Sequence, residues 1–187
     1  MKNLSIEFET PTKALLSEYA KLSIEYLVES EFHMEWINNG LGGIGLTEVQ
    51  VEPYWKNYDT PDNNPSHLID KFDMANWKVL SVYDGAIRVA GAILAFETQG
   101  IHMLEGRNDL VDIWDIRVDK AYRGHGVGQM LFAACVDWAR EMKCTRIKVE
   151  TQNNNTKACK FYASQGAKLS NVNKHAYKDP PVSVWWC

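Results

Sequence analysis

A glycine-rich segment in the middle of the chain has the residue types of a phosphate-binding loop. It runs from Arg123 to Gln129, and beyond Gly126 the apolar residues recur with the period of one helical face. The first N–H groups of a helix have no partner inside it, and the helix dipole adds roughly half a positive charge there. Because glycines allow close approach and Arg123 adds a charged donor, the segment predicts a site for an anion such as a pyrophosphate.

Known kinds of phosphate-binding loop can be compared with this segment. A P-loop ends in Gly-Lys-Ser/Thr, whereas this one ends in Gly128-Gln129-Met130 and lacks the lysine and hydroxyl for Mg-nucleotide chemistry. A dinucleotide fold needs Gly-x-Gly-x-x-Gly, whereas the glycines here are spaced Gly-x-Gly-x-Gly. The pattern that remains is Arg-x-x-Gly-x-Gly, and a ligand-free turn between a strand and a helix is the alternative.

A second pattern lies further along the chain. A strand is expected over Arg146–Thr151 and a short helix over about Thr156–Gln165, because Asn155 is a good N-cap and Gly166 suits the position after a helix. The sequence of this helix reads Asn155-x-x-Ala158-x-x-Phe161-Tyr162.

Together the two patterns resemble the signatures of one superfamily. Arg-x-x-Gly-x-Gly is similar to the acyl-CoA-binding signature of the GNAT superfamily of N-acyltransferases, and Asn-x-x-Ala-x-x-Phe-Tyr is similar to its second signature. The resemblance covers about residues 76–187 and is strongest from Asp112 to Tyr162. Within the superfamily, the run from Glu150 to Tyr162 is most similar to the streptothricin acetyltransferases.

The resemblance implies acetyl-CoA as the acyl donor, held largely by main chain. Backbone N–H groups near Ile116 to Val118 would hold the pantetheine arm and the oxyanion, and the glycine-rich loop would hold the pyrophosphate. The donor-binding residues implied are Ile116, Arg117, Val118, Arg123, Gly124, His125, Gly126, Val127, Gly128, Gln129, Asn155, Ala158 and Tyr162. For Asn155, an N-cap role alone is the alternative.

The same resemblance makes Tyr162 the expected proton donor. A phenol with a reference pKa near 10 stays protonated at neutral pH and can supply a thiolate whose reference pKa is about 8.5. The alternative is that Tyr162 is a half-buried helix aromatic, as Phe161 is expected to be.

Two carboxylates, Asp115 and Glu150, are expected beside the acceptor amine. Either could anchor an ammonium group or accept its proton, directly or through water. Because side chains alternate along a strand, Asp115 is expected on the face opposite Trp114 and Ile116. The alternative for each acid is an ordinary ion pair with a basic residue of its own strand.

The remaining elements follow from periodicity and from turn residues. A helix is expected over Thr12–Ala20, and the ten residues after it fit either a helix or a strand. Loops are expected at Gly40–Gly45, Pro61–Pro65 and, exposed, at Gly100–Asn108. Strands are expected at Leu4–Phe8, Leu46–Val51 (ending at Pro53), Trp77–Tyr83, Ile87–Phe96, from Val111, and at Ala167–Asn173 and Val182–Trp186 on either side of Pro180-Pro181.

This order of elements predicts a single domain over residues 1–187. The fold class is α+β with α/β layers, in which a mixed sheet is flanked by helices. By resemblance the sheet is GNAT-like, mostly antiparallel, with a splayed central strand pair.

The composition of the chain limits the kinds of molecule that it is expected to bind. A net charge of −4 gives no basic footprint for nucleic acid or an anionic membrane, and a small cationic substrate fits better. No targeting segment and no apolar run long enough to span a bilayer is visible, so a cytoplasmic protein is expected. The four cysteines lack the spacing of a zinc site or a redox dithiol, so no metal is expected.

These features lead to an expected reaction. An acetyl group would pass from acetyl-CoA to a primary amine of a small cationic substrate, with the β-lysine moiety of a streptothricin antibiotic favoured, which would inactivate the antibiotic. Another amine is the alternative, such as a polyamine, a lysine-like metabolite or a protein N-terminus. A non-catalytic acyl-CoA-binding sensor is a third option, and a homodimer is compatible with the sequence.

Overall fold

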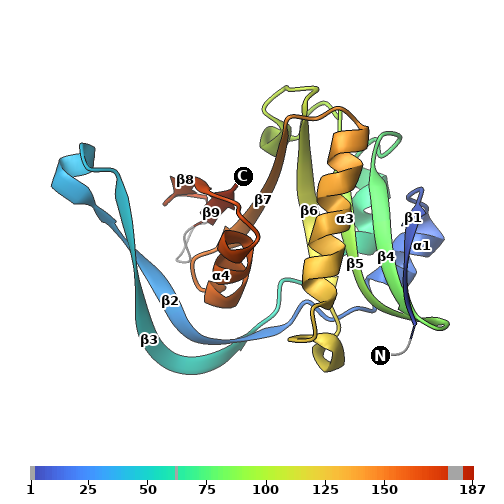
Figure 1. Ribbon diagram of the computed structural model, residues 1–187, viewed down its shortest axis with the longest axis horizontal. Coiled ribbons are helices and arrows are strands. Elements are labelled where there is room, and N and C mark those ends of the chain that lie inside the picture. Colours follow the sequence, from blue (N-terminus) through green and yellow to red (C-terminus); the bar gives the residue numbers. More distant parts are fainter. Residues whose placement is uncertain (1–2, 62, 177–182) are drawn as a thin grey trace. The chain divides into compact units, whose positions relative to one another are not determined.

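A computed structural model describes residues 3–61, 63–176 and 183–187. The chain forms two compact units (Figure 1). Unit 1 contains residues up to Ile24 and Tyr58–Val149, and unit 2 contains Glu25–Asn57 and the residues from Glu150. Strand β7 (Arg146–Gln152) begins in unit 1 and ends in unit 2.

Unit 1 is a twisted sheet with helices packed against it (Figure 1). Its strands lie in the order β1-β4-β5-β6-β7, and every neighbouring pair is antiparallel except the parallel pair β6–β7. The mixed, mostly antiparallel sheet predicted from the sequence is therefore confirmed. The other elements of this unit are β1 (Leu4–Glu9), α1 (Lys13–Tyr19), η2 (Pro65–His67), α2 (Leu68–Lys71), β4 (Lys78–Asp84), β5 (Ile87–Ala95), η3 (His102–Leu104), β6 (Leu110–Val118), η4 (Lys120–Tyr122) and α3 (Val127–Glu141).

Helix α1 forms where the sequence predicted it. Thr12 is its N-cap, and the Oγ1 of Thr12 accepts a hydrogen bond from the N–H of Leu15 at 3.1 Å. The helix buries Leu16 and Tyr19 against the sheet. The cluster around them is Leu16, Tyr19, Leu68, Met74, Trp77, Val79, Ile93, Ala95, Ile101, Leu104 and Leu110. On the other side of β5, Phe96 packs edge-on against Trp138 of α3.

The loop around η3 corrects one sequence expectation. Gly100–Asn108 was predicted to be exposed, yet Ile101 and Leu104 are almost fully buried in the core cluster of unit 1. The apolar side chains at these positions anchor the loop. The prediction was wrong because the glycine and charged residues around them are typical of an exposed loop.

Unit 2 contains a long two-stranded hairpin and the carboxyl-terminal elements. Strand β2 (Tyr26–Trp36) pairs antiparallel with β3 (Ile44–Lys56), and η1 (Ile37–Gly40) lies in the turn between them. The second part of the unit holds α4 (Thr156–Ser164), β8 (Leu169–Asn173) and β9 (Ser183–Trp186), in the strand order β7-β9-β8. Val182 and the predicted Pro180-Pro181 break lie outside the described residues.

The hairpin departs from the sequence prediction in length. A strand ending at Pro53 was expected, whereas β3 continues through Pro53 to Lys56. Proline is tolerated here because, within the described ranges, β2 is the one strand that pairs with β3. The pairing is irregular between Val28 and Ser30, opposite this part of β3. Gly45 also lies in the strand, although the turn before it is the loop that was predicted.

Two asparagines hold the base of this hairpin inside unit 2. The Nδ2 of Asn153 donates to the carbonyl oxygen of Phe32 at 2.9 Å, and the N–H of Phe32 donates to the carbonyl oxygen of Asn153 at 2.9 Å. The amide of Asn154 accepts from Tyr26 Oη and donates to Tyr54 Oη, both at 3.0 Å. Part of the polar run after β7 therefore has a structural role, since it fixes the strands of the hairpin.

Candidate active site

The glycine-rich loop has the backbone geometry that its sequence predicted. Gly124 and Gly126 have positive φ values of 77° and 83°, which favour glycine. Gly126 is the N-cap of α3 and provides no side-chain hydrogen bond to the first turn. A Cβ added at either glycine would find no heavy atom within 4 Å. The loop therefore leaves the amides at the start of a 15-residue helix open to an anion.

Arg123 has contacts that the sequence did not indicate. Its Nε donates to the carbonyl oxygen of Val118 at 2.8 Å, and its Nη2 donates to the carbonyl oxygen of Ser23 at 3.2 Å. The guanidinium thus joins the glycine-rich loop to β6 and to the segment after α1. Its predicted role in binding pyrophosphate stays a prediction.

Strand β6 is paired with β7 along only half of its length. The parallel register runs from Leu110↔Arg146 to Ile113↔Val149, and no partner strand continues it within the described part of unit 1. The N–H of Asp119 donates to Val89 of β5 at 2.8 Å. Because successive N–H groups of a strand alternate between its two edges, those of Ile116 and Val118 point toward the unpaired edge, and that of Arg117 points toward β5.

A β-bulge in β6 corrects the predicted direction of one side chain. Ile93 of β5 lies opposite Asp115 and Leu94 lies opposite Ile113, so Trp114 is an extra residue. Trp114 packs against the core cluster that contains Tyr19, and Asp115 bonds to the hydroxyl of Tyr19. The two side chains therefore share a face of the sheet, although simple alternation placed them on opposite faces.

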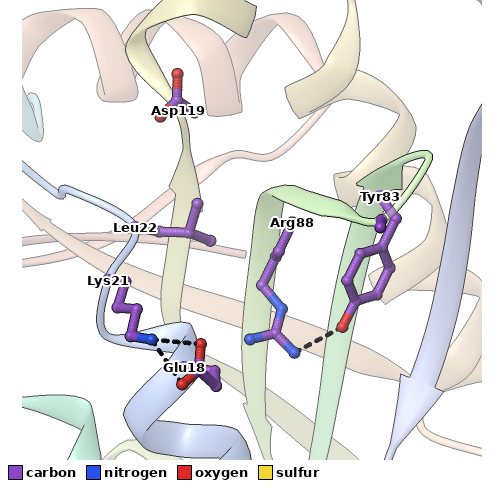
Figure 2. Close-up of a pocket in the computed structure, with 7 residues that line it drawn as sticks. Glu18, Lys21, Leu22, Tyr83, Arg88 and Asp119 are labelled. Atoms are coloured by element: carbon purple, nitrogen blue, oxygen red, sulfur yellow. Dashed lines mark hydrogen bonds and ion pairs between the residues drawn. The ribbon is translucent and has the colours of Figure 1, made fainter.

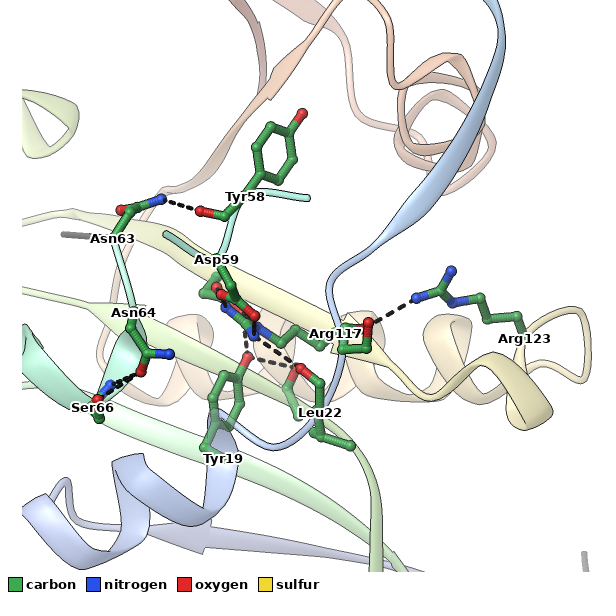
Figure 3. A network of polar contacts seen from close by, with 12 residues as sticks. Tyr19, Leu22, Tyr58, Asp59, Asn63, Asn64, Ser66, Arg117 and Arg123 are labelled. Carbon is green, nitrogen blue, oxygen red and sulfur yellow. Dashed lines mark hydrogen bonds and ion pairs between the residues drawn. The ribbon is translucent and has the colours of Figure 1, made fainter. Parts of the chain in front are cut away.

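Arg117 lies in a polar cluster with Tyr19, Leu22 and Asp59 (Figure 3). Asp115 of the same strand belongs to this cluster. Arg117 Nε donates to Asp115 Oδ1 and Arg117 Nη2 donates to Asp115 Oδ2, both at 2.8 Å. Asp59 binds the same guanidinium at 2.8 Å from Nη1 and 2.7 Å from Nη2. Tyr19 Oη donates to Asp115 Oδ1 at 2.6 Å. Asp115 thus makes the ion pair that was the alternative to a direct catalytic role.

Burial and charge together shift two pKa values in this cluster. Burial, and then the charge of Asp115, raise the pKa of the Tyr19 phenol well above its usual value. Burial alone would lower the pKa of the Arg117 guanidinium, but its hydrogen bond to Asp115, the charge of Asp115 and its hydrogen bond to Asp59 raise that pKa. Tyr19 is therefore a neutral donor and Arg117 a cation at neutral pH.

The second signature lies on α4 in unit 2. Asn155 is the N-cap of this helix, and its Oδ1 accepts a hydrogen bond from the N–H of Ala158 at 3.2 Å. Tyr162 is 4% exposed and its ring meets the ring of Phe161 edge-on. Near the end of β7, the Oε1 of Gln152 is buried and has no hydrogen-bond partner among the described residues. This acceptor would suit an amide N–H of a bound molecule.

The predicted site residues are divided between the two units. Ile116, Arg117, Val118 and the glycine-rich loop belong to unit 1, as does Asp115. Glu150, Asn155, Ala158 and Tyr162 belong to unit 2.

Sequence reasoning missed three parts of the polar cluster, namely Tyr19, Leu22 and Asp59. Tyr19 fits the apolar face of the helix predicted over Thr12–Ala20, and its position there gives no sign of a polar role. Asp59 lies in a polar segment without any motif, and the Leu22 carbonyl has no side-chain signal at all.

A cavity of about 350 Å³ lies elsewhere in unit 1, beside the β4–β5 hairpin (Figure 2). The residues that line it are Glu18, Lys21, Leu22, Tyr83, Ala86, Arg88 and Asp119. None of the residues predicted for donor or acceptor lines it. The charged residues in its wall already have partners: Lys21 pairs with Glu18 at 2.6 Å, Arg88 donates to Tyr83 Oη at 2.8 Å, and Asp119 accepts from the N–H of Ala121 at 2.9 Å.

The described residues contain no group of three or more His, Cys, Asp or Glu side chains that could hold a metal ion. Among them there is also no helix long and apolar enough to cross a membrane.

Comparisons with known proteins decide the family. The family model of the acetyltransferase (GNAT) family matches residues 47–167. The chain belongs to the GNAT acetyltransferase family. It is an acetyl-CoA-dependent N-acetyltransferase, as the two sequence signatures implied.

Two relatives within the GNAT family are similar to this chain over most of its length. A streptothricin acetyltransferase of Escherichia coli is 31% identical over 150 residues, which are 77% of this chain and 75% of the relative. Streptothricin acetyltransferase A of Bacillus subtilis (strain 168) is 27% identical over 140 residues, 72% of this chain and 73% of that one.

A solved structure agrees in fold. It comes from Bacillus anthracis str. Ames, is provisionally assigned as a streptothricin acetyltransferase, and was crystallised in complex with acetyl coenzyme A. It has a TM-score of 0.74 at 23% identity and covers 97% of this chain and 98% of its own. At this identity the match shows the GNAT fold.

Proposed function

We propose that this acetyltransferase modifies a streptothricin-type antibiotic on an amine of its β-lysine moiety. The observation that carries the proposal is the 31% identity to the Escherichia coli streptothricin acetyltransferase over 77% of the chain. The run from Glu150 to Tyr162, which resembles that family, supports it. Acetylation would remove the positive charge of the amine and so inactivate the antibiotic.

The residues of unit 1 fit the donor that the family uses. The uncapped first turn of α3 and the open surface at Gly124 and Gly126 suit a pyrophosphate. The N–H groups of Ile116 and Val118 on the unpaired edge of β6 suit the pantetheine arm and the oxyanion. When bound, acetyl-CoA supplies an activated acetyl thioester. Gln152 of unit 2 has a buried acceptor, Oε1, with no hydrogen-bond partner among the described residues, which suits an amide N–H of a bound molecule.

The acceptor amine must lose a proton before it can react. An amine with a reference pKa of about 10 is neutral in only about one molecule per thousand at pH 7. Both oxygens of Asp115 are engaged by Arg117 and Tyr19, so we assign proton acceptance to Glu150, directly or through water. Asp115 contributes negative charge that attracts the ammonium form.

Acetyl transfer then needs groups that stabilise the oxyanion and groups that move protons. The neutral amine nitrogen attacks the thioester carbonyl and forms the C–N bond, and N–H groups of β6 stabilise the oxyanion. Collapse of this intermediate breaks the C–S bond. Tyr162 protonates the departing thiolate, the excess proton on the nitrogen passes to water, and Tyr162 and Glu150 return to their starting states by exchanging protons with water.

The experiment mixes purified protein and acetyl-CoA with a panel of amines and measures the released thiol. We expect nourseothricin or streptothricin to react at least tenfold faster, in kcat/KM, than spermidine or free lysine. Mass spectrometry should find one acetyl group on the β-lysine moiety, and cells that express the protein should survive streptothricin, with Asp115→Asn weakening that protection. Thiol release with spermidine or lysine but none with streptothricin would mean that another amine is the substrate.

A further inference from the structure

Two arginines hold the segment of unit 1 that follows helix α1. Arg117 Nη1 donates to the carbonyl oxygen of Leu22 at 2.9 Å, and Arg123 Nη2 donates to the carbonyl oxygen of Ser23 at 3.2 Å (Figure 3). These carbonyls are consecutive, and the chain leaves unit 1 directly afterwards, at Ile24. The contacts therefore fix the point where the chain departs toward the β2–β3 hairpin.

Arg117 also holds the point where the chain returns. Unit 1 resumes at Tyr58, and the next residue, Asp59, receives two hydrogen bonds from the guanidinium. One side chain of β6 thus binds the chain on both sides of residues 25–57. We use the name latch for Arg117, Asp59 and the Leu22 carbonyl.

Arg117 makes more hydrogen bonds than its ion pair with Asp115 requires. A guanidinium has five N–H donors, and all five are used although the side chain is only 1% exposed. Two of them satisfy Asp115 on the same strand. The other three go to Leu22 and Asp59, which lie 95 and 58 residues away in sequence. More than half of the bonding capacity therefore serves the two connections and not the sheet.

The position of Arg117 on β6 links the latch to acetyl transfer. Arg117 lies between Ile116 and Val118, whose N–H groups point to the unpaired edge that we assign to the donor. The side chain of Arg117 points to the sheet face that carries α1, because its Cζ lies 5.5 Å from the centroid of the Tyr19 ring. The held segments thus border the reacting end of the donor arm on the α1 face, while the glycine-rich loop lies at the start of α3.

We propose that Arg117 and Asp59 are positioning residues for the acceptor amine. The latch fixes residues 20–24 and 58–61 in the arrangement that binds the acceptor amine beside the thioester. When these segments loosen, only a fraction of the protein holds that arrangement, and the apparent affinity for the amine falls by the same factor. The proposal rests on acetyl transfer to an amine, which the family establishes, and not on which amine is used.

The test compares Asp59→Asn with a matched control, Glu105→Gln. Glu105 pairs at 2.6 Å with Lys148, whose side chain is also 1% exposed, so both variants take a loop carboxylate from a buried cation of a central strand in unit 1. Steady-state kinetics use the amine that the parent protein acetylates fastest. Failure of streptothricin as a substrate therefore changes the amine and leaves this comparison intact.

For Asp59→Asn we expect the KM of the amine to rise at least tenfold, and the Kd of acetyl-CoA by calorimetry to stay within twofold. Hydrogen exchange should become faster in residues 20–24 and 58–61. Glu105→Gln should leave both the KM of the amine and this exchange within twofold of the parent values. If Asp59→Asn does not fold, Asp59→Glu keeps the charge and displaces the carboxylate, and a two- to fivefold rise in the KM of the amine is expected.

Other results would overturn the proposal. An amine KM within twofold of the parent value would show that the latch is structural only. An equal rise for Glu105→Gln would show that lost stability and not position is responsible. A tenfold weaker binding of acetyl-CoA would place Asp59 on the donor side.

Discussion

Substitution of Gly126 by valine separates the backbone role of the glycine-rich loop from its proposed donor role. Gly126 has a φ of +83°, and a Cβ there would meet no heavy atom within 4 Å. The strain of the substitution is therefore conformational, about 1–2 kcal/mol for an L-residue in the left-handed region, with a branched side chain at the upper end. For a chain of 187 residues this corresponds to a fall of roughly 2–8 °C in Tm.

The effect on donor binding should exceed the effect on stability. The valine side chain would occupy the open space in front of the first turn of α3, where we expect the pyrophosphate. We predict that the Kd of acetyl-CoA, measured by calorimetry, rises more than tenfold, which is a loss of more than about 1.4 kcal/mol.

Gly85→Val provides the control in the same unit. Gly85 lies in the β4–β5 turn with a φ of +63°, and its Cβ would also meet no heavy atom within 4 Å. It should lose a similar amount of stability and bind acetyl-CoA as the parent does. If Gly126→Val bound acetyl-CoA with unchanged affinity, the loop would not be the donor site and the reasoning from its open amides would be wrong.

Two further predictions concern Tyr162 and Cys159. Tyr162→Phe keeps the ring, so a general-acid role predicts a loss in kcat of about a hundredfold with little change in Tm, and a loss below about threefold would leave the tyrosine structural. Burial raises the pKa of the Cys159 thiol to about 12. The unfolded chain loses this proton near pH 8.5, so the thiol's stabilising contribution falls from about pH 8.5 to about pH 12, at up to about 1.4 kcal/mol per pH unit. Denaturant titrations at several alkaline pH values should show a shallower decline for Cys159→Ala, and an unchanged slope would contradict the buried neutral thiol.

The backbone geometry of the segments that we propose for the donor could be predicted from sequence because its signals are local. The positive φ values at Gly124 and Gly126 and the cap at Asn155 each depend on residues within a few positions. Local patterns also gave the correct bounds of α1 to within one residue at each end. Main-chain sites of this kind are therefore visible in a single sequence.

The polar cluster around Arg117 could not be predicted in the same way because its contacts join distant residues. Tyr19 and Asp115 are 96 residues apart, and Arg123 and Ser23 are 100 apart. No periodicity or spacing rule covers such separations. The bulge at Trp114 adds a second difficulty, since one extra residue reverses the face on which a side chain is expected.

The cluster around Arg117 also changes how the acids should be interpreted. Asp115 was attractive as a base from sequence because it lies on the central strand near the donor. In the structure its two oxygens accept three hydrogen bonds from Arg117 and Tyr19, so both are already engaged by protein groups. A carboxylate held in this way acts best through its charge and through what it positions. We therefore assign proton removal to Glu150 or to water. Asp115→Asn should weaken binding of the acceptor in two ways, through the lost negative charge and through a looser latch.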